Sequence, residues 1–284
     1  MPELSPLLAD RIAAASAFVF DMDGTLVLGD AASGGHQSLP GAAALLSELR
    51  VRGTPFRVFT NGTAKPPEVY ASSLRHAGLD VADHEMMTPS TAAAAWFVAK
   101  GIKRVRVLGL AGVQAPLIEA GLDVIGPSEK AEGVEAVYTG WFREFTFPDL
   151  EAAYKDVWAG AMLTTASNVP FFATAGGRAI GASYAINAMI RAMTGKRAKV
   201  LGKPSREALR SALTLMKLPV SAEASTVIVG DDPALEMRMA RSAGAIGVAV
   251  TTGLCSRDDF MARGSPERAD AILPGLQPIL EALN

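Results

Sequence analysis

Short apolar segments alternate with longer segments of helical composition along this chain, and that alternation constrains the fold more than any other feature. Strands that alternate with helices are typical of parallel βα units. We expect strands at residues 17–20, 56–59, 105–108, 136–138, 163–165, 226–229 and 246–250. We expect helices at residues 41–50, 67–77, 91–100, 148–159, 183–193, 205–216 and 234–243. The sequence therefore predicts an α/β fold whose core is a doubly wound, Rossmann-like parallel sheet.

Polar motifs follow some of the expected strands and not others. They are Asp-Met-Asp-Gly-Thr at 21–25, Thr-Asn-Gly at 60–62, Gly-Lys-Pro-Ser at 202–205 and Gly-Asp-Asp-Pro at 230–233. Ligands of parallel sheets bind beyond the carboxyl ends of strands, so these motifs mark the candidate site. The stretch 88–199 has strands and helices of its own but none of these motifs. We therefore expect a core domain of residues 1–87 and 200–284, with a second α/β domain of residues 88–199 inserted into it.

Asp21 and Asp23 stand two residues apart at the end of an expected strand. On extended backbone their side chains leave the same face, and two carboxylates so close do not both ionise freely. Either one of them is protonated or a cation lies between them. A calcium-binding loop is excluded, because Leu26 stands where such a loop needs Gly and Ala32 where it needs Glu.

A second acidic pair, Asp231 and Asp232, follows another expected strand and precedes Pro233. A helix N-cap explains one aspartate but not two. Together with Asp21 and Asp23, the pair suggests an oxygen-ligand site of the kind that Mg²⁺ prefers.

The two remaining motifs carry groups that suit an anion. Lys203 lies between Gly202 and Pro204, and its alternative interpretation is an ordinary solvated surface lysine. Residues 60–62 supply a hydroxyl, an amide and backbone N–H groups for phosphate oxygens, and they also fit an ordinary turn.

Charge and cysteine content exclude several classes of protein. Lysine and arginine number 27 and aspartate and glutamate 29, so the net charge of −2 gives no general attraction to nucleic acid. The single cysteine, Cys255, forms no intramolecular disulfide, and the three histidines are too scattered to form a zinc framework. The apolar run at 12–20 is too short to span a membrane and is followed at once by aspartates. We expect a cytoplasmic protein without membrane or nucleic-acid partners.

Taken in order, the four motifs resemble those of the haloacid dehalogenase superfamily of phosphatases. The long insertion between the second and third motifs is similar to the α/β cap of one subfamily. That subfamily includes p-nitrophenyl phosphatases, phosphoglycolate and pyridoxal phosphate phosphatases, and bacterial nucleotide monophosphatases. The resemblance covers nearly the whole chain and includes the cap segment at 165–183, which is similar to the family's substrate-facing region.

The resemblance implies a role for each motif residue of the core. Asp21 is the nucleophile that forms an aspartyl phosphate, and Asp23 is the general acid for the leaving alcohol and then the base for water. Mg²⁺ binds the Asp21 carboxylate, the Asp23 main-chain carbonyl and Asp231. Either Asp232 or Glu236 completes the outer shell of the metal, because the aspartate that the family usually has five residues after the first is Glu236 here.

The resemblance also implies groups that hold the substrate. Thr60 and Asn61, with the backbone at Gly62, contact the phosphoryl group, and Lys203 neutralises charge on the nucleophile and the transferring group. In the cap, Asn168 and Arg178 are the candidate contacts with the rest of the substrate. Residues 171–178 are either a simple surface hairpin or a loop that closes over the phosphate site.

These expectations combine into a magnesium-dependent phosphatase acting on small phosphorylated metabolites. Phosphoryl transfer to another acceptor and a non-catalytic phosphometabolite-binding protein are the alternatives that the sequence leaves open. Because members of the family often dimerise through the cap, a homodimer of that kind is a further expectation.

Overall fold

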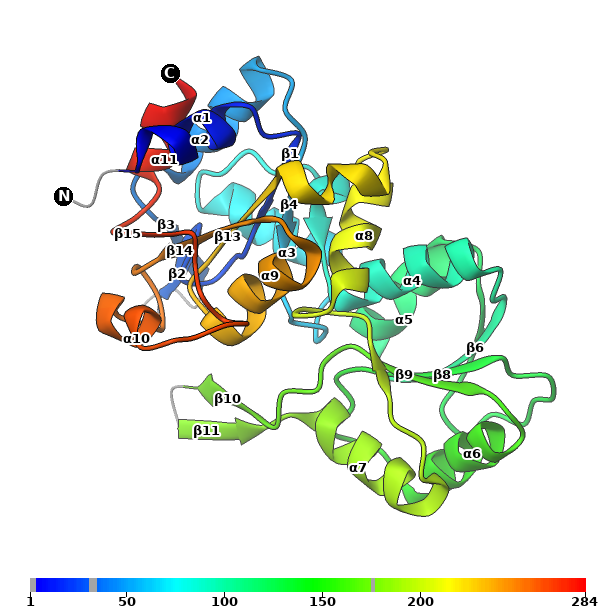
Figure 1. Cartoon of the computed structure of the whole chain (residues 1–284). Helices are drawn as coiled ribbons and strands as arrows, with labels where there is room; N and C mark the ends of the chain where they lie inside the picture. The colour runs from blue at the N-terminus through cyan, green and yellow to red at the C-terminus, as the bar shows by residue number, and fades with distance from the viewer. Residues whose placement is uncertain (1–3, 31–34, 175–176) are drawn as a thin grey trace. The chain divides into compact units, whose positions relative to one another are not determined.

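The computed structural model describes residues 4–30, 35–174 and 177–284 of the 284-residue chain (Figure 1). The chain forms two compact units. Unit 1 comprises Met1–Thr60, Glu68–Met87 and Pro204–Asn284, and unit 2 comprises Asn61–Pro67 and Thr88–Lys203. Two of the crossings between the units therefore lie inside polar motifs, one after Thr60 and one after Lys203.

Unit 1 contains a six-stranded sheet in which all neighbouring strands are parallel. Its strands, in spatial order, are β15 (Ala271–Leu273), β14 (Ile246–Val250), β13 (Thr226–Gly230), β1 (Ala17–Phe20), β4 (Phe56–Phe59) and β5 (Met86–Met87). The chain continues from β1 to β4 on one side and later adds β13 on the other side, so the strand order reverses at β1. Such a reversal is the usual ligand-binding point of a doubly wound sheet. The predicted α/β fold class is confirmed.

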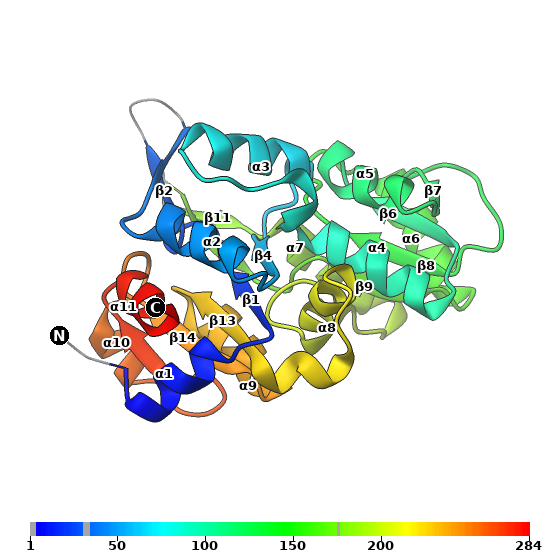
Figure 2. The ribbon, with the colours of Figure 1, turned by 90° about the horizontal axis from the view of Figure 1, so that it is seen from above.

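Helices cover both faces of this sheet, and α2 and α3 lie on the opposite side of β1 and β13 from α8 and α9 (Figure 2). A short antiparallel hairpin, β2 (Val27–Asp30) and β3 (Gly35–Ser38), follows β1 directly. The helical elements of unit 1 are α1 (Pro6–Ala13), α2 (Ala42–Val51), α3 (Pro67–His76), η1 (Asp83–Glu85), α8 (Arg206–Leu215), η2 (Val220–Ser225), the π-helical turn η3 (Pro233–Met237), α9 (Arg238–Ala243), α10 (Arg257–Met261) and α11 (Gln277–Leu283).

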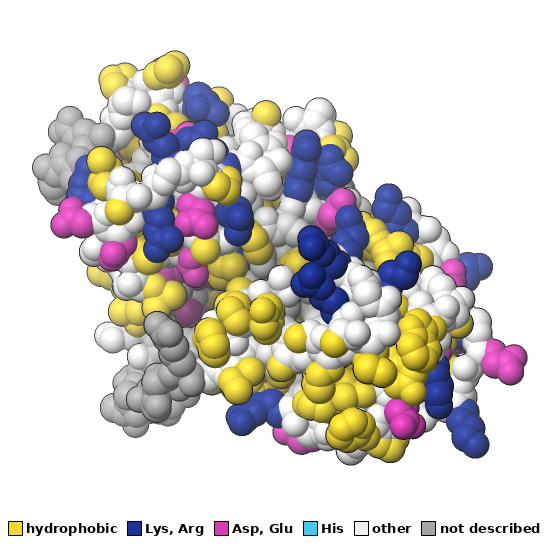
Figure 3. Space-filling view, turned by 60° about the horizontal axis from the view of Figure 1, so that its bottom comes forward, with side chains coloured by type: hydrophobic (Ala, Val, Ile, Leu, Met, Phe, Trp, Pro, Cys, Tyr) yellow, Lys and Arg dark blue, Asp and Glu magenta, His cyan; other side chains and the backbone are white. Residues whose placement is uncertain are grey.

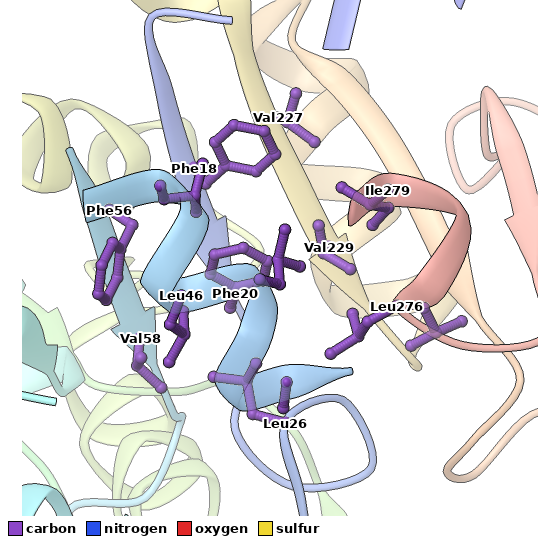
Figure 4. Packing of buried hydrophobic residues seen from close by; sticks show 14 of the residues in the cluster. Phe18, Phe20, Leu26, Leu46, Phe56, Val58, Val227, Val229, Leu276 and Ile279 are labelled. Atoms are coloured by element: carbon purple, nitrogen blue, oxygen red, sulfur yellow. The ribbon is translucent and has the colours of Figure 1, made fainter. Parts of the chain in front are cut away.

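The main core of unit 1 fixes the central strands. Phe18 and Phe20 of β1 stack with their ring centroids 5.6 Å apart and pack with Val229 of β13, Leu46 of α2 and Ile279 of α11 (Figure 4). Burying one large apolar side chain stabilises a fold by roughly 1.5–3 kcal/mol. The carboxyl ends of β1 and β13, which precede the two acidic motifs, are therefore anchored by buried side chains.

Unit 2 has its own parallel sheet, with strand order β12 (Lys199–Val200), β9 (Met162–Thr165), β8 (Ala136–Thr139), β6 (Arg104–Leu108) and β7 (Asp123–Ile125). One face packs on α4 (Pro89–Lys100) and α5 (Ala111–Glu119), and the other face packs on α6 (Phe147–Trp158) and α7 (Ala182–Thr194). An antiparallel hairpin, β10 (Phe171–Thr174) and β11 (Gly177–Ile180), follows β9.

Hydrophobic and charged side chains both lie on the surface of the protein (Figure 3). Hydrophobic side chains gather on the face drawn in Figure 3, with lysines and arginines between them. Within the described ranges, no helix combines the length and the apolar character that crossing a membrane requires.

Candidate active site

Two buried aspartates follow the two central strands of unit 1. The Asp21 amide donates to the carbonyl of Val229 at 2.9 Å, which continues the pairing of β1 with β13 by one residue. Asp231 follows β13 directly. Asp21 is 9% exposed and Asp231 is 3% exposed. Because neighbouring parallel strands end at the same edge of a sheet, both carboxylates belong to the carboxyl edge at the point where the strand order reverses.

The surroundings of Asp231 leave no room for side chains larger than glycine. A Cβ atom at Gly24 or at Gly253 would overlap the Asp231 carboxylate, and Gly24 has a φ of +82°, which disfavours other residues. The Leu254 amide donates to Asp231 Oδ2 at 2.8 Å, and the Thr252 hydroxyl donates to the Gly24 carbonyl at 2.6 Å. The carboxylate is thus fixed by two glycines and one backbone donor.

The loop that carries Thr252, Gly253 and Leu254 was not among the expected site residues. It follows β14, the strand beside β13. A glycine preceded by two threonines at the end of an apolar run is the sequence signal that marks this loop.

Asp23 has different surroundings from Asp21. The strand ends at Phe20, and the Gly24 amide donates to the Val27 carbonyl at 2.7 Å, which turns the chain into β2. The expectation that both side chains leave the same face needed extended backbone from Asp21 through Asp23, but the chain bends at Met22. The Asp23 side chain is 56% exposed, and its Oδ1 lies 3.2 Å from Nε2 of His36.

Asp232, the second aspartate after β13, and the nearby Glu236 have different surroundings. The Asp232 carboxylate accepts from the Ala234 amide at 2.8 Å and caps η3, as the N-cap interpretation predicts. Glu236 is 1% exposed, and its Oε2 accepts from the Asp232 amide at 3.2 Å. A Cβ at Gly230 would overlap the Glu236 side chain, so Glu236 lies over the strand end that carries Asp231. The π-helical turn is a form that recurs at functional sites.

The third strand of the central group brings Thr60 to the same edge of the sheet. Thr60 follows β4, which pairs with β1, and its amide donates to the Met87 carbonyl at 3.2 Å. Its side chain is 7% exposed. Three adjacent strands, β13, β1 and β4, therefore end in the residues that the motifs singled out.

In unit 2, Asn61 and Lys203 are hydrogen-bonded to each other at two of the four chain crossings. The Lys203 amide donates to Asn61 Oδ1 at 3.0 Å, and Asn61 Nδ2 donates to the Lys203 carbonyl at 3.1 Å. Lys203 is 1% exposed, so the interpretation as a solvated surface lysine is wrong. Gly202 is required beside it, because a Cβ there would overlap the Ala166 carbonyl oxygen. Gly62 lies next to Asn61 and is half-buried.

The expected cap residues lie after β9. Asn168 is exposed and lines a hollow of about 330 Å³ in unit 2, together with Tyr184 and Arg191. The loop is held from within, since the Ser183 hydroxyl donates to the Ser167 carbonyl at 3.0 Å. Arg178 belongs to β11, and its side chain lies outside the described residues.

β10 and β11 pair as an antiparallel hairpin, and closure of this segment over the phosphate site stays a prediction. The Gly181 amide donates to the Pro170 carbonyl at 2.9 Å and closes the base of this hairpin.

The donor set of unit 1 suits a hard cation. Across the described ranges, no three His, Cys, Asp or Glu side chains converge as a metal-binding group. Mg²⁺ does not need three, because it retains several waters and binds proteins through one or two carboxylates. Asp21 and Asp231 supply two buried carboxylates from adjacent strands, and the glycines around Asp231 keep other side chains away. These residues therefore fit Mg²⁺.

Two family models match this sequence. The model of haloacid dehalogenase-like hydrolases matches residues 18–123, and a second, HAD-hydrolase-like model matches residues 200–279. The matches contain every core motif, and the segment between them lies in unit 2. The predicted resemblance is confirmed.

Relatives of known name cover almost the whole chain. Dihydroxyacetone phosphatase of Corynebacterium glutamicum is 26% identical over 267 residues, which cover 93% of this chain and 90% of that protein. The structure of 4-nitrophenylphosphatase from Thermotoga maritima superposes with a TM-score of 0.82 at 23% identity, covering 96% of this chain and 99% of that one. The structure of glycerol phosphate phosphatase from Mycobacterium tuberculosis, solved with magnesium, superposes with a TM-score of 0.78 at 24% identity. It covers 94% of this chain and 77% of that one.

Proposed function

Because this chain belongs to the haloacid dehalogenase-like hydrolases, we propose that it is a phosphatase that hydrolyses small phosphate monoesters through an aspartyl phosphate. The observation that carries the proposal is the contrast between two aspartates of one motif. Asp21 is buried at the end of the central strand, whereas the Asp23 side chain is 56% exposed. A nucleophile must be held in one place, and a proton carrier must reach solvent and the leaving group.

The reaction has two balanced steps. In the first, a carboxylate oxygen of Asp21 bonds to phosphorus, the bond from phosphorus to the ester oxygen breaks, and Asp23 gives its proton to the leaving alcohol. In the second, Asp23 takes a proton from water as the water oxygen bonds to phosphorus. The acyl phosphate bond then breaks, which releases inorganic phosphate and restores the Asp21 carboxylate.

Asp21, the Asp23 main-chain carbonyl and Asp231 are the proposed ligands of Mg²⁺. When bound, the ion supplies positive charge that aligns the phosphoryl group and offsets the charge that develops on it. We assign the outer position to Glu236 rather than Asp232, because the Asp232 carboxylate caps η3 and the buried Glu236 lies over Gly230.

The phosphoryl oxygens are assigned to Thr60 and to the backbone at Asn61 and Gly62. The side-chain amide of Asn61 already bonds both main-chain groups of Lys203, so its proposed task is to hold that lysine. Lys203 supplies fixed positive charge, which acts most strongly where water is excluded. Its burial supports this role, since a buried ammonium group is costly unless negative charge is near it.

The substrate class is small phosphorylated metabolites, with unit 2 as the cap that selects among them through Asn168 and Arg178. This proposal rests on the phosphatase relatives and on the exposed position of Asn168. We further propose a cytoplasmic location. A homodimer formed through the cap stays a prediction, which the mass of the protein in solution tests.

A phosphate-release screen over phosphorylated metabolites, with p-nitrophenyl phosphate as a reference, tests the activity. Asp21→Asn should lower turnover to below a few per cent with unchanged melting, because an amide is a poor nucleophile of the same size. Asp10→Asn, an exposed aspartate of α1, is the matched control and should keep full activity. Excess chelator should also abolish turnover.

The same screen separates the alternatives. Alcohol released without an equal amount of phosphate, in the presence of a sugar acceptor, would indicate phosphoryl transfer. Substrate binding without any turnover would indicate a binding protein. Residual activity of Asp21→Asn above a few per cent would remove Asp21 from its assigned role.

A further inference from the structure

The β2–β3 hairpin brings a histidine to the exposed aspartate of the first motif. His36 lies in β3 opposite Gly29 of β2. Its Nε2 is 3.2 Å from Asp23 Oδ1, and its Nδ1 is 2.7 Å from the hydroxyl oxygen of Ser73 in α3. The imidazole ring is therefore held at both nitrogens, by two elements that are far apart in the sequence.

The chemistry of the two partners decides which nitrogen carries the proton. Oδ1 of an ionised Asp23, or of an Asp23 that carries its proton on Oδ2, only accepts hydrogen bonds, so a protonated Nε2 donates to it. In the tautomer with its proton on Nε2, Nδ1 accepts a hydrogen bond from the Ser73 hydroxyl, which can act as donor or acceptor. Ser73 thereby stabilises the tautomer that donates toward Asp23.

Stability alone is a weak reason for this contact. The side chain of His36 is 20% exposed and that of Asp23 is 56% exposed. Exposed pairs of this kind add about 0–1 kcal/mol to the free energy of unfolding. What the contact does restrict is the rotation of the Asp23 carboxyl group.

We infer that His36 is a positioning residue for Asp23, and this inference rests on the proposed function. With Nε2–H donating to Oδ1, the proton that Asp23 transfers is carried on Oδ2. In the first step this proton goes from Oδ2 to the leaving oxygen, and in the second step Oδ2 takes a proton from water. His36 neither gains nor loses a proton in either step.

The test compares kcat/KM for two substrates. This ratio covers only the steps through departure of the leaving group, so the later role of Asp23 as a base does not affect it. p-Nitrophenolate leaves without help from an acid, whereas an alkoxide needs one. The alkyl phosphate that the wild type hydrolyses fastest and p-nitrophenyl phosphate are therefore measured on each variant.

We expect His36→Ala to lower kcat/KM for the alkyl phosphate by roughly tenfold, and for p-nitrophenyl phosphate by less than about twofold. His36→Gln, whose amide reaches the place of Nε2, should recover most of the loss. Ser73→Ala removes only a hydroxyl and should give a smaller loss of the same selectivity. His76→Ala is the matched control, because His76 bonds the Ser72 carbonyl of its own helix at 2.7 Å.

The variant Asp23→Asn shows whether a failed test contradicts the role of His36 or the acid role of Asp23. Suppose that Asp23→Asn lowers kcat/KM more for the alkyl phosphate than for p-nitrophenyl phosphate, and that neither His36→Ala nor Ser73→Ala does so. Then the positioning role of His36 is wrong and the proposed function stands. If Asp23→Asn is not selective, the acid role of Asp23 fails and the inference fails with it. Equal losses on both substrates in His36→Ala would also overturn the inference, and Ser73→Ala keeps the test valid if His36→Ala melts early.

Discussion

Two glycines of unit 1 form a matched pair that tests whether Asp231 needs its close packing. Gly24 and Gly53 both have a positive φ, +82° and +68°. A Cβ added at Gly53 meets nothing within 4 Å, whereas one added at Gly24 overlaps the Asp231 carboxylate. Substitution by alanine therefore imposes the same kind of backbone strain at both positions, and a steric collision only at Gly24.

The difference between the two variants can be estimated from the contacts. The left-handed backbone costs alanine roughly 1–2 kcal/mol at either position. At Gly24 the displaced carboxylate also loses the bond from the Leu254 amide, which is 2.8 Å long. A hydrogen bond to a charged group contributes about 1.5–3 kcal/mol, so Gly24→Ala should lose that amount beyond Gly53→Ala.

Two measurements check this estimate. Urea titration gives the free energy of unfolding of each variant, and hydrogen exchange reports the protection of the Leu254 amide. We expect faster exchange at Leu254 in Gly24→Ala only. If Asp231 binds Mg²⁺, the concentration of Mg²⁺ that gives half-maximal phosphate release should rise by roughly tenfold or more, as it does when groups that support metal ligands are lost. Equal stability, exchange and Mg²⁺ dependence in the two variants would refute the reasoning.

Three further predictions concern other parts of the chain. Asn61→Ala removes both hydrogen bonds to the main chain of buried Lys203, so it should lower the free energy of unfolding by about 2–4 kcal/mol. The exposed Asn168→Ala is the control for this stability measurement. Asn61→Ala should also lower the rate of phosphate release at least tenfold. Burial alone would raise the pKa of Glu223, but hydrogen bonds from two arginines hold that pKa below its ordinary value of 4.5. Glu223→Gln should therefore lose about 1–2 kcal/mol at neutral pH, and its deficit in urea titrations should shrink as pH falls from 4.5 through the folded pKa. Arg178→Ala should lower kcat/KM roughly tenfold for the best metabolite that carries a second anion, with little change for p-nitrophenyl phosphate; equal losses on both would indicate a damaged cap.

The central strands were predictable because they are buried on both faces. Each is a short apolar run followed by polar or glycine residues, and the structure places each expected strand within a residue or two of its predicted position. The helix α5 was missed because it contains Pro116, which lacks the amide that a helix interior needs. The β2–β3 hairpin was missed because its sequence has neither an apolar alternation nor a typical two-residue turn.

The candidate site was predictable where one strand end carries its residues. Asp21, Thr60 and Asp231 follow neighbouring strands, and sequence order with strand type is enough to bring them to one edge. The contacts of His36 with Asp23 and Ser73 depend on the position of a hairpin relative to a helix. Sequence spacing does not encode such a contact, so the three histidines were interpreted only as evidence against zinc.

Because β1 ends at Phe20, the two aspartates of the first motif, Asp21 and Asp23, have different surroundings. Had the strand continued through Asp23, two carboxylates on one face would have required a shared cation or a shared proton. Instead, the chain bends at Met22, Asp21 stays buried at the strand end, and the hairpin after Gly24 brings His36 to the Asp23 carboxyl group. The second carboxylate at the buried strand ends is then Asp231, from the adjacent strand β13. Under the proposed function, one three-residue segment thus supplies a buried group for attack and an exposed group for proton transfer, and the difference in burial suits the two tasks.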